Sequence, residues 1–461
     1  MSRPNILFIQ SDQHRFDCIG ANGHQLVHTP HLDRLASEGV NFTSAYTPAP
    51  ICTPARISLQ YGCWPTQHLG IANELSEAPR PAIEGLISFS QLLHDAGYYL
   101  GYIGKWHVHP HYGPLHYGYD YYIPSNDYRA WRLTQHMNDV PNLNGWWGEI
   151  DPYVLPEQTA LGWGANEVIT LLQAKAGRSQ SFFIRWDTDV PHLPNILPEP
   201  YCSQITPEQV SPWPSFGDPL IGKPYIQGQQ KRSWMIENWT WEQWAPIVAR
   251  YLGQISLLDS QLGRVLETLE QLNLASNTIV IYTADHGDMC GGHGMADKHY
   301  VMYEDVTHVP LIIRWPGTAK KCICCPAFVS SALDLALTFC QVAQIDIPDT
   351  FVGHSLLPLL SGASDNGRRD IVSTYFGNQF GLYSQRMLRS RSVKYVWNLT
   401  AEDELYDLEH DPGEISNLAT SPAYHDILSD HRLRLLAWME ETKDPLLNQW
   451  TRTQLAMNNK I

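Results

Sequence analysis

Four short apolar segments of the chain are each followed by ionisable side chains, and this pattern constrains the fold most strongly. The segments and the residues that follow them are 5–10 before Asp12, 98–103 before Lys105 and His107, 181–186 before His192, and 278–282 before Asp285 and His286. Continuous apolar runs of this length are typical of strands buried on both faces. Because ligands bind beyond the carboxyl ends of strands in open parallel sheets, we expect these polar residues to converge.

Stretches with the apolar spacing of helices separate these segments. Thr29 is expected to cap a helix that ends before Gly39, residues 87–96 form another, and residues 241–272 carry a long apolar stripe. A further strand is expected at 311–314. Strands that alternate with helices predict an α/β fold with a large, mostly parallel sheet flanked by helices.

The pattern changes in the last quarter of the chain. Residues 386–398 have the character of a strand, residues 404–408 form a short one, and a turn at 411–414 precedes a terminal helix. We therefore expect a large domain at 1–365 that carries the site, and a smaller C-terminal α+β domain at 366–461 with an antiparallel sheet.

Composition excludes several classes of protein. The formal net charge of −16 disfavours a nucleic-acid partner, and no apolar run is long enough to span a bilayer, so no membrane partner is expected. The start lacks the cleavage site of a signal peptide, and nine cysteines without regular spacing fit reduced thiols, so a cytoplasmic protein is expected. The cysteine cluster at 322–325 fits thiols in a loop better than a soft-metal site.

The sequence Cys-Thr-Pro-Ala-Arg at 52–56 places a thiol at the start of a predicted helix. Pro54 suits the first helical position and Thr53 is a good capping residue before it. The positive end of the helix and the nearby Arg56 would lower the pKa of the Cys52 thiol. A reactive Cys52 is therefore plausible, but the sequence does not show which histidine would serve as its base.

The same residues match the C-x-P-x-R element of the sulfatase family, in which the cysteine is oxidised to formylglycine. Further matching elements follow in the family's order: the strand that ends in Asp12, Gly-Lys-Trp-His at 104–107, Pro-His-Leu-Pro at 191–194, Ala-Asp-His-Gly at 284–287 with Lys298 behind it, and the segment 404–418. The chain thus resembles a sulfatase of the alkaline-phosphatase-like superfamily over most of its length, close to bacterial carbohydrate and choline-type sulfatases.

The resemblance implies a role for each matching residue. A formylglycine hydrate at position 52 would attack sulfur, and the sulfated diol would then collapse and release sulfate. The metal ligands would be Asp12, Asp285, His286 and the modified Cys52. Arg56 would hold the diol, Lys105 and Lys298 would neutralise sulfate oxygens, His107 would take the proton on collapse, and His192 would protonate the leaving alcohol or hydrogen-bond the sulfate.

Two residues depart from the commonest family pattern. Gln13 stands where a second aspartate is usual, so it is expected to contact substrate or a metal-bound oxygen. His286 stands where many arylsulfatases have asparagine. Oxygen ligands favour Ca²⁺ or Mg²⁺, while the imidazole makes Mn²⁺ more competitive, and Ca²⁺ is the metal we expect. Asn73 is a further candidate substrate contact, although an ordinary turn asparagine fits equally well.

The expected substrate is a small anion, a sulfated mono- or oligosaccharide or another small sulfate ester. Irregular stretches at 106–164 and 193–242 are rich in tryptophan, and we expect most of these rings to form small cores and a few to stack on a sugar. A formylglycine-generating maturation enzyme is the implied protein partner, and the oligomeric state stays open. The alternatives are a phosphonate monoester or phosphodiester hydrolase, a catalytically silent binding protein of the same fold, and an enzyme that uses the Cys52 thiol directly.

Overall fold

The computed structural model describes all residues except 1–2, 74–84, 364–366, 378–382, 458–459 and 461. Its centre is a sheet that contains eight strands within the described residues, in the order β11-β2-β10-β9-β1-β7-β4-β5. The strands are β1 Asn5–Asp12, β2 Val40–Phe42, β4 Tyr99–Gly104, β5 Tyr121–Pro124, β7 Phe182–Pro191, β9 Thr278–Ala284, β10 Leu311–Arg314 and β11 Ile323–Cys325. Only β10 runs antiparallel to its neighbours here, so the mostly parallel sheet is confirmed.

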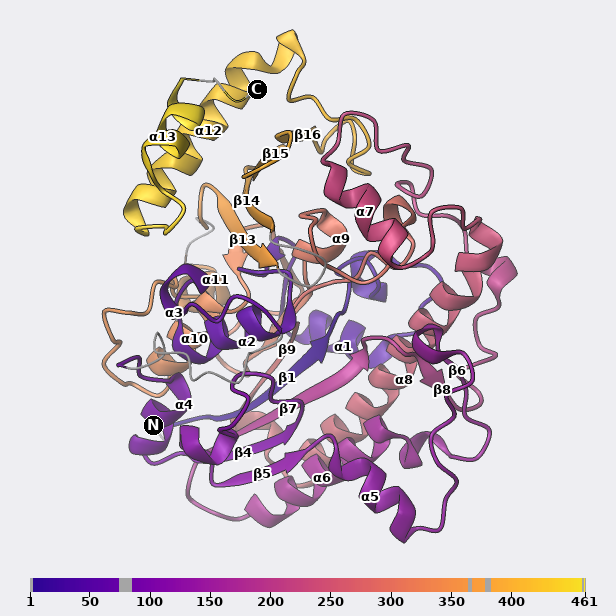
Figure 1. Ribbon diagram of the computed structural model, residues 1–461. Coiled ribbons are helices and arrows are strands. Elements are labelled where there is room, and N and C mark those ends of the chain that lie inside the picture. Colours follow the sequence, from indigo (N-terminus) through magenta and orange to yellow (C-terminus); the bar gives the residue numbers. More distant parts are fainter. Residues whose placement is uncertain (1–2, 74–84, 364–366, 378–382, 458–459, 461) are drawn as a thin grey trace.

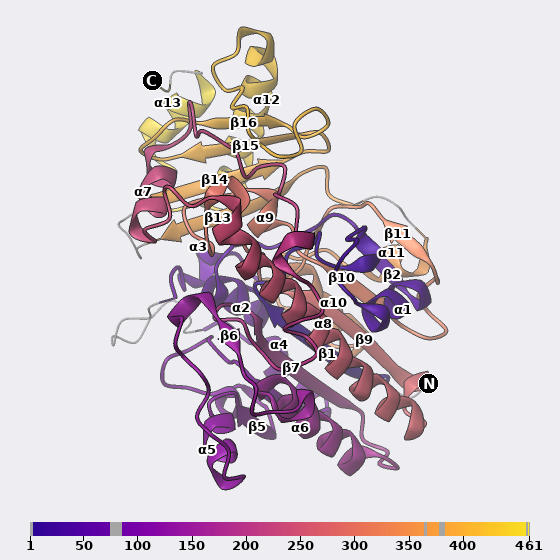
Figure 2. The same ribbon diagram turned by 90° about the vertical axis from the view of Figure 1, so that its right-hand side faces the viewer.

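Helices cover both faces of this sheet, as Figures 1 and 2 show. Along β1, Leu7 and Ile9 face one apolar layer and Ile6 and Phe8 face the other. The first layer contains α1 Pro30–Glu38, α6 Ala160–Lys175 and α8 Trp241–Gln271, and the second contains α2 Cys52–Tyr61, α4 Phe89–Asp95 and α10 Leu333–Val342. Both faces of β1 are therefore buried, which explains its continuous apolar sequence.

The start of α1 differs from the sequence prediction. The side chain of Thr29 makes no capping hydrogen bond to the helix. Instead, the carboxylate of Asp259 on α8 accepts hydrogen bonds from the backbone N–H groups of His31 at 3.1 Å and Leu32 at 2.7 Å. A side chain more than two hundred residues away thus satisfies the free donors of the helix, and local sequence could not indicate it.

The C-terminal part contains an antiparallel sheet of four strands in the described chain, in the order β13-β14-β15-β16. The strands are β13 Ile371–Gly377, β14 Tyr383–Arg389, β15 Val393–Asn398 and β16 Glu404–Asp407. The strand character expected at 386–398 is confirmed for most of these residues, and a turn closed by Ser390 N–H and Val393 O at 2.8 Å divides them between β14 and β15. The expected domain boundary at residue 365 lies outside the described residues.

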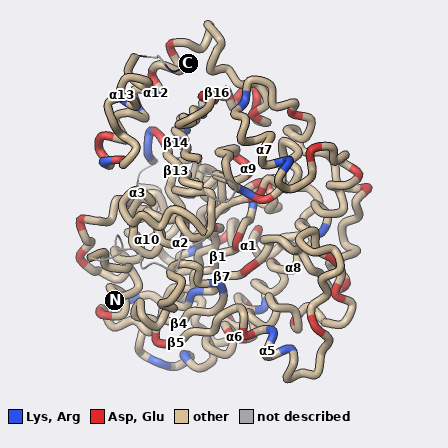
Figure 3. The backbone as a smooth tube through the Cα atoms, in the orientation of Figure 1, with Lys and Arg blue, Asp and Glu red and all other residues tan. Residues whose placement is uncertain are grey.

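The helices of the C-terminal part lie beside this sheet, at one end of the molecule (Figures 1 and 2). They are α12 His425–Glu441 and α13 Gln449–Ala456, and their apolar side chains pack with those of β14 and β15. No helix of the described chain is both long and apolar enough to cross a membrane. Figure 3 shows lysines and arginines interspersed with acidic residues along the chain.

Short elements interrupt the stretches expected to be irregular. They include α5 Asp127–Thr134 and α7 Tyr225–Ser233, and β5 extends the central sheet at its edge. The remaining short elements are α3 Pro65–His68, α9 Glu304–Thr307, α11 Leu357–Ser361, β3 Ala45–Tyr46, β6 Glu149–Ile150, β8 Ile196–Leu197 and β12 Val329–Ser330. Several tryptophans pack together in one small apolar core, at positions 147, 234, 239, 241 and 244, as expected.

Candidate active site

Polar side chains meet at the carboxyl ends of four central strands. The register of β1 against β9 ends one residue before Asp12 and Asp285, so these carboxylates leave the sheet side by side. The register of β4 against β7 ends with Gly104 opposite Asp187, and Lys105 is the next residue after Gly104. The Lys105 ammonium lies 2.6 Å from Asp12 Oδ2. The structure thus brings together side chains that are hundreds of residues apart in the sequence.

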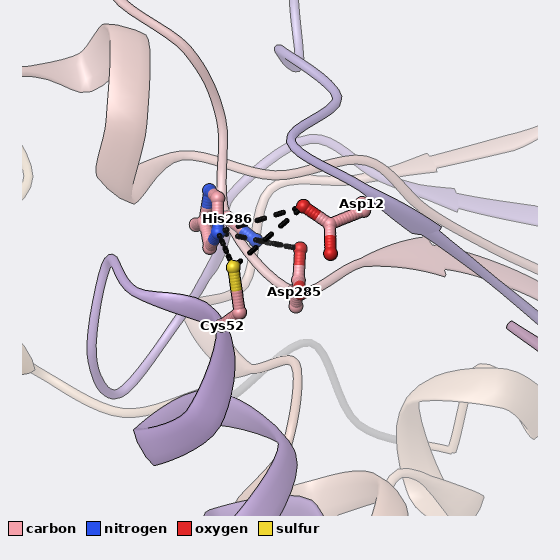
Figure 4. A group of neighbouring side chains, drawn as sticks. All are labelled: Asp12, Cys52, Asp285 and His286. Carbon is pink, nitrogen blue, oxygen red and sulfur yellow. Dashed lines mark hydrogen bonds and ion pairs between the residues drawn. The ribbon is translucent and has the colours of Figure 1, made fainter. Parts of the chain in front are cut away.

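Helix α2 delivers Cys52 to the same place (Figure 4). The helix begins at Cys52 and not at Pro54, and Thr53 is not its cap, because the Thr53 hydroxyl is buried without a hydrogen-bond partner in the described chain. The Cys52 Sγ atom lies 3.1 Å from His286 Nε2 and 3.7 Å from Asp12 Oδ1. The thiol therefore faces the carboxylates at the strand ends.

Asp12, Cys52, Asp285 and His286 form what we call the donor group. One ligand atom from each lies within 4.8 Å of the other three, and all four residues are buried. His286 Nδ1–H donates to the Gly287 carbonyl at 2.8 Å, which leaves the Nε2 lone pair directed at the group. No other such cluster of three or more possible ligands occurs among the described residues.

The electrostatics of the donor group favour a bound cation. Burial and the neighbouring Asp12 raise the pKa of the Asp285 carboxyl. Burial also acts to raise the pKa of Asp12, but Lys105 and the other nearby cations hold it well below its usual range. Although burial lowers it, Asp285 and Cys52 raise the pKa of His286 to about 9. The negative charge of the group thus favours a bound positive charge, which is a proton on His286 Nε2 at neutral pH or a metal cation that replaces this proton.

Arg56 lies at the centre of a buried network of ion pairs. Its guanidinium donates to Asp285 Oδ2 at 2.9 Å, to Asp12 Oδ2 at 3.0 Å and to Asp187 Oδ2 at 2.7 Å. Asp187 also accepts a hydrogen bond from the Tyr102 hydroxyl at 2.7 Å. Arg56 therefore orients two members of the donor group, and within the described chain its guanidinium donates to carboxylates and to the Lys105 carbonyl.

Asp187 is a site residue that the sequence did not single out. It follows the apolar run at 182–186 inside β7, and this position was the available signal. Arg185, two residues earlier, donates to both of its oxygens at 2.7 Å. Because Arg185 holds the Asp187 carboxylate in place, this carboxylate fixes the position of Arg56. A local sequence pattern does not reveal contacts of this kind.

Gln13 does not face the donor group with its amide. Its Nε2 donates to Asp288 Oδ2 at 2.6 Å, and its Oε1 accepts from the Lys298 ammonium at 2.6 Å. Lys298 also pairs with Asp297 at 2.9 Å. These two hydrogen bonds give Gln13 a part in positioning Lys298, and its expected contact with substrate or a metal-bound oxygen stays a prediction.

His192 lies next to Lys298. Its Nδ1–H donates to the Leu193 carbonyl at 2.6 Å, and its Nε2 accepts from the Lys298 ammonium at 2.8 Å. Burial and the charge of Lys298 lower the pKa of His192 to about 4. A histidine that is neutral and already accepts a hydrogen bond is poorly suited to protonate a leaving alcohol, so this arrangement favours a hydrogen-bonding role over the acid role.

Asn73 and His107 are the other two candidates, and they lie outside the network around Lys298. Asn73 Oδ1 accepts a hydrogen bond from the Thr53 backbone at 3.0 Å, and its Nδ2 lies 3.8 Å from Cys52 Sγ, so it borders the thiol. His107 follows β4 with a positive φ of 49°, and its Nδ1 is buried without a hydrogen-bond partner in the described part of the chain. Among the described residues, no hydrogen bond or ion pair links His107 to the donor group.

A cavity of about 370 Å³ adjoins these residues. Lys105 and His192 lie in its wall, and its other walls come from α5, α6, β7 and α8. Its size is that of ordinary small-molecule pockets. A ligand held at the donor group would therefore extend into this cavity.

Comparisons with known proteins agree with this geometry. The family model described as "Sulfatase" matches residues 4–360, and the model "N-sulphoglucosamine sulphohydrolase, C-terminal" matches residues 291–441. The uncharacterized sulfatase YidJ of Escherichia coli is 30% identical over 475 residues, which cover 98% of this chain and 90% of that protein. A Delta 4,5-hexuronate-2-O-sulfatase of Bacteroides thetaiotaomicron is 27% identical, with 96% of this chain and 90% of that protein covered.

Solved structures show the same fold. The phosphonate monoester hydrolase of Agrobacterium radiobacter superposes with a TM-score of 0.82 at 24% identity, over 95% of this chain and 96% of that one. At this identity the likeness concerns the fold. The family model covers most of the chain, so this protein belongs to the sulfatase family, whose members are hydrolases of sulfuric esters with an alkaline-phosphatase-like fold.

Proposed function

We propose that this protein hydrolyses a sulfate ester of a carbohydrate or another small alcohol, with Cys52 converted to formylglycine and Ca²⁺ held by the donor group. The observation that carries the proposal is the buried donor group at the carboxyl edge of the sheet, with Lys105 within 2.6 Å of it. Membership of the sulfatase family supports it, and so do relatives named for their action on sulfated sugars.

The donor group fits a hard divalent cation. It offers two carboxylates, one imidazole nitrogen with its lone pair directed inward, and, after conversion, the oxygens of residue 52. Oxygen-rich sets favour Ca²⁺ or Mg²⁺, and the imidazole also admits Mn²⁺. When bound, the cation would acidify the hydrate oxygen of residue 52 and neutralise charge on a sulfate oxygen.

The protein's own cations would hold the sulfate. Lys105 lies 4.0 Å from Cys52 Sγ, and Lys298 lies on the side of Gln13 and His192. Although burial lowers it, Asp297 and Cys52 hold the pKa of Lys298 above its usual value, so its ammonium is charged at neutral pH. Two fixed cations near the reacting sulfur would stabilise the charge that develops as the S–O bond breaks.

The hydrate oxygen of residue 52 would attack sulfur and displace the alcohol, and a base must then remove the second hydrate proton so that sulfate leaves. Among the residues expected to act here, His107 carries a buried ring nitrogen without a partner in the described chain, and this nitrogen is available for that proton. His192 would keep Lys298 in place as a hydrogen-bond acceptor. The proton lost by the attacking hydrate oxygen would pass through solvent to the leaving alcohol, so that this step balances, and Lys298, whose pKa is raised, would remain an ammonium throughout.

Conversion of Cys52 is tested by mass spectrometry of the peptide that contains it, after expression with a formylglycine-generating enzyme. The expected result is the aldehyde mass, together with hydrolysis of p-nitrophenyl sulfate that EDTA abolishes and Ca²⁺ restores. A Cys52→Ser variant should lose this hydrolysis. A Cys324→Ser variant, which changes a solvent-exposed thiol, should keep it.

Three outcomes would overturn the proposal. Phenyl phosphonate hydrolysed faster than every sulfate ester would favour the phosphonate monoester hydrolase. Inactivation by iodoacetamide with indifference to EDTA would show that Cys52 acts as a thiol. A protein with converted Cys52 and bound metal but no esterase activity would be a binding protein.

A further inference from the structure

The cavity beside the donor group has an unusual charge balance. Its lining includes two basic side chains, Lys105 and Arg132, and two acidic ones, Asp151 and Asp189. Arg132 and Asp151 form a buried ion pair at 2.7 Å and neutralise each other. Lys105 is committed to Asp12 and to the sulfate position. The remaining charged side chain of the lining is the carboxylate of Asp189, an exposed residue that also lies within the electrostatic influence of Lys105.

No cation in the described lining is left for a second acidic group. The Arg132 guanidinium also contacts the Tyr128 hydroxyl and the carbonyls of Asn138 and Asp139, and its side chain is only 2% exposed. A carboxylate carried by the sugar would thus lie near Asp189 and would have no cation with which to form an ion pair. Like charges at short range in a partly enclosed site oppose binding.

Gln254 adds a second hydrogen-bond acceptor. It lies on α8, is 4% exposed and belongs to the lining of the cavity. Its Oε1 is buried and has no hydrogen-bond partner in the described structure. An unpaired buried carbonyl is costly, and a hydroxyl group of a ligand would satisfy it.

Trp146 supplies an apolar wall. Its side chain is 56% exposed, and its ring lies 6.3 Å from the His192 ring, centroid to centroid, at the cavity. An exposed indole next to hydrogen-bond acceptors suits the C–H face of a pyranose ring, whose edge carries hydroxyl groups. The cavity therefore offers acceptors and an aromatic surface, but no free donor cation among its described residues.

We infer that the substrate is the sulfate ester of an uncharged sugar, whose hydroxyl groups donate to Asp189 and Gln254 while its ring packs on Trp146, and that sulfated uronates are rejected. This inference rests on the proposed sulfatase function and specifies the alcohol. It distinguishes this chain from the relative named as a hexuronate sulfatase. Asp189 would be the residue that sets the specificity.

The test uses matched pairs of substrates. Methyl hexosides sulfated at carbon 2, 3 or 4 are each compared with the uronide sulfated at the same carbon, so that members of a pair differ only at carbon 6. For wild-type protein with converted Cys52, kcat/KM for a neutral hexoside should exceed kcat/KM for the matching uronide by about tenfold or more, because the uronide places a carboxylate near Asp189. p-Nitrophenyl sulfate, which has no hydroxyl group, serves as the reference.

Asp189→Asn keeps the size of the side chain and removes its charge. It should lower kcat/KM for the neutral hexoside about 10- to 100-fold more than kcat/KM for p-nitrophenyl sulfate, and it should narrow the preference within the pair. Asp426→Asn removes one charge from the exposed surface of α12 and should change none of these values.

The outcomes separate the two proposals. The inference alone is overturned by any of three results in a protein that hydrolyses p-nitrophenyl sulfate. These are no preference for the neutral member of a pair, no hydrolysis of any hexoside, and a preference that Asp189→Asn leaves unchanged. Faster turnover of choline sulfate than of every hexoside also overturns it, since a cationic alcohol would then be the ligand of Asp189. Failure to hydrolyse any sulfate ester, aryl sulfate included, overturns the proposed function and the inference together.

Discussion

At the scale of single residues, Gln13 shows how one substitution changes a site without changing the fold. An aspartate at this position would add a charge near the donor group, whereas the amide of Gln13 links Asp288 to Lys298 through two hydrogen bonds of 2.6 Å. The structure therefore gives Gln13 a part in positioning Lys298.

Gln13→Leu is expected to lower kcat/KM for p-nitrophenyl sulfate by about 10- to 100-fold, because Lys298 loses an acceptor and Asp288 loses a donor. Combined with Lys298→Ala, it should add little further loss, since both changes remove the same function. Gln173→Leu, on the exposed side of α6, should leave activity unchanged. Additive losses in the double variant would contradict the positioning role.

Arg56 provides a second prediction at this scale. Arg56→Lys keeps the charge, but one ammonium cannot donate to Asp12, Asp187 and Asp285 in the geometry of the guanidinium. We expect a loss of about 3 kcal/mol or more in the free energy of unfolding, measured in urea, and a loss of metal affinity measured by calorimetry. Arg129→Lys, in an exposed pair with Asp139, should change neither quantity, and equal effects of the two variants would contradict the assignment.

At the scale of elements, the sequence predicts the central strands better than their surroundings. The apolar runs that end in Asp12 and Asp285 became β1 and β9, because strands buried on both faces leave a pattern in their own residues. The cap of α1 depends on Asp259, a partner elsewhere in the chain, whereas the division of 386–398 into β14 and β15 comes from a local turn that the alternating pattern does not reveal.

The same distinction applies to the site. Cys52 and His286 were identified because they stand in contiguous motifs, and the structure brings them within 3.1 Å of each other. Asp187 and Asp288 act through Arg56 and Gln13 respectively, so their relevance is apparent only once the tertiary contacts are known. Local patterns indicate the groups that perform chemistry, whereas the residues that orient them are determined by packing.

The end of β4 gives a prediction for an element. Gly104 has a φ of 107°, and a Cβ there would overlap the carbonyl oxygen of Asp187 on β7. Gly104→Ala should therefore separate the ends of β4 and β7, displace Lys105, and lower both the Tm and kcat/KM.

Gly177→Ala is the matched control, because Gly177 has a φ of 72° but no atom within 4 Å of the position that a Cβ would occupy. It shares the backbone strain of Gly104→Ala without the overlap, so it should lower the Tm slightly and leave kcat/KM unchanged. A loss of activity as large as that of Gly104→Ala would show that strain, and not the displacement of Lys105, is responsible.

At the scale of the whole molecule, buried neutral histidines make the fold sensitive to acid. His14 and His68 are both fully buried. Burial lowers the pKa of His14 to about 4 and that of His68 to about 3. In the unfolded chain their pKa returns to about 6.5. Their contribution to stability is therefore present above pH 6.5 and is lost as the pH falls toward the folded values, because the unfolded chain then binds protons that the folded chain excludes.

The expected loss is on the order of 3 kcal/mol for each of these histidines between pH 6.5 and pH 4. Urea unfolding across this range should show that the stability of His68→Gln, relative to wild type, rises as the pH falls, because glutamine takes up no proton in either state. His111→Gln, which changes an exposed histidine, should parallel wild type at every pH. A constant difference between wild type and His68→Gln would mean that His68 binds its proton equally in both states, and the acid sensitivity would then have to arise from the paired carboxylates around Arg56.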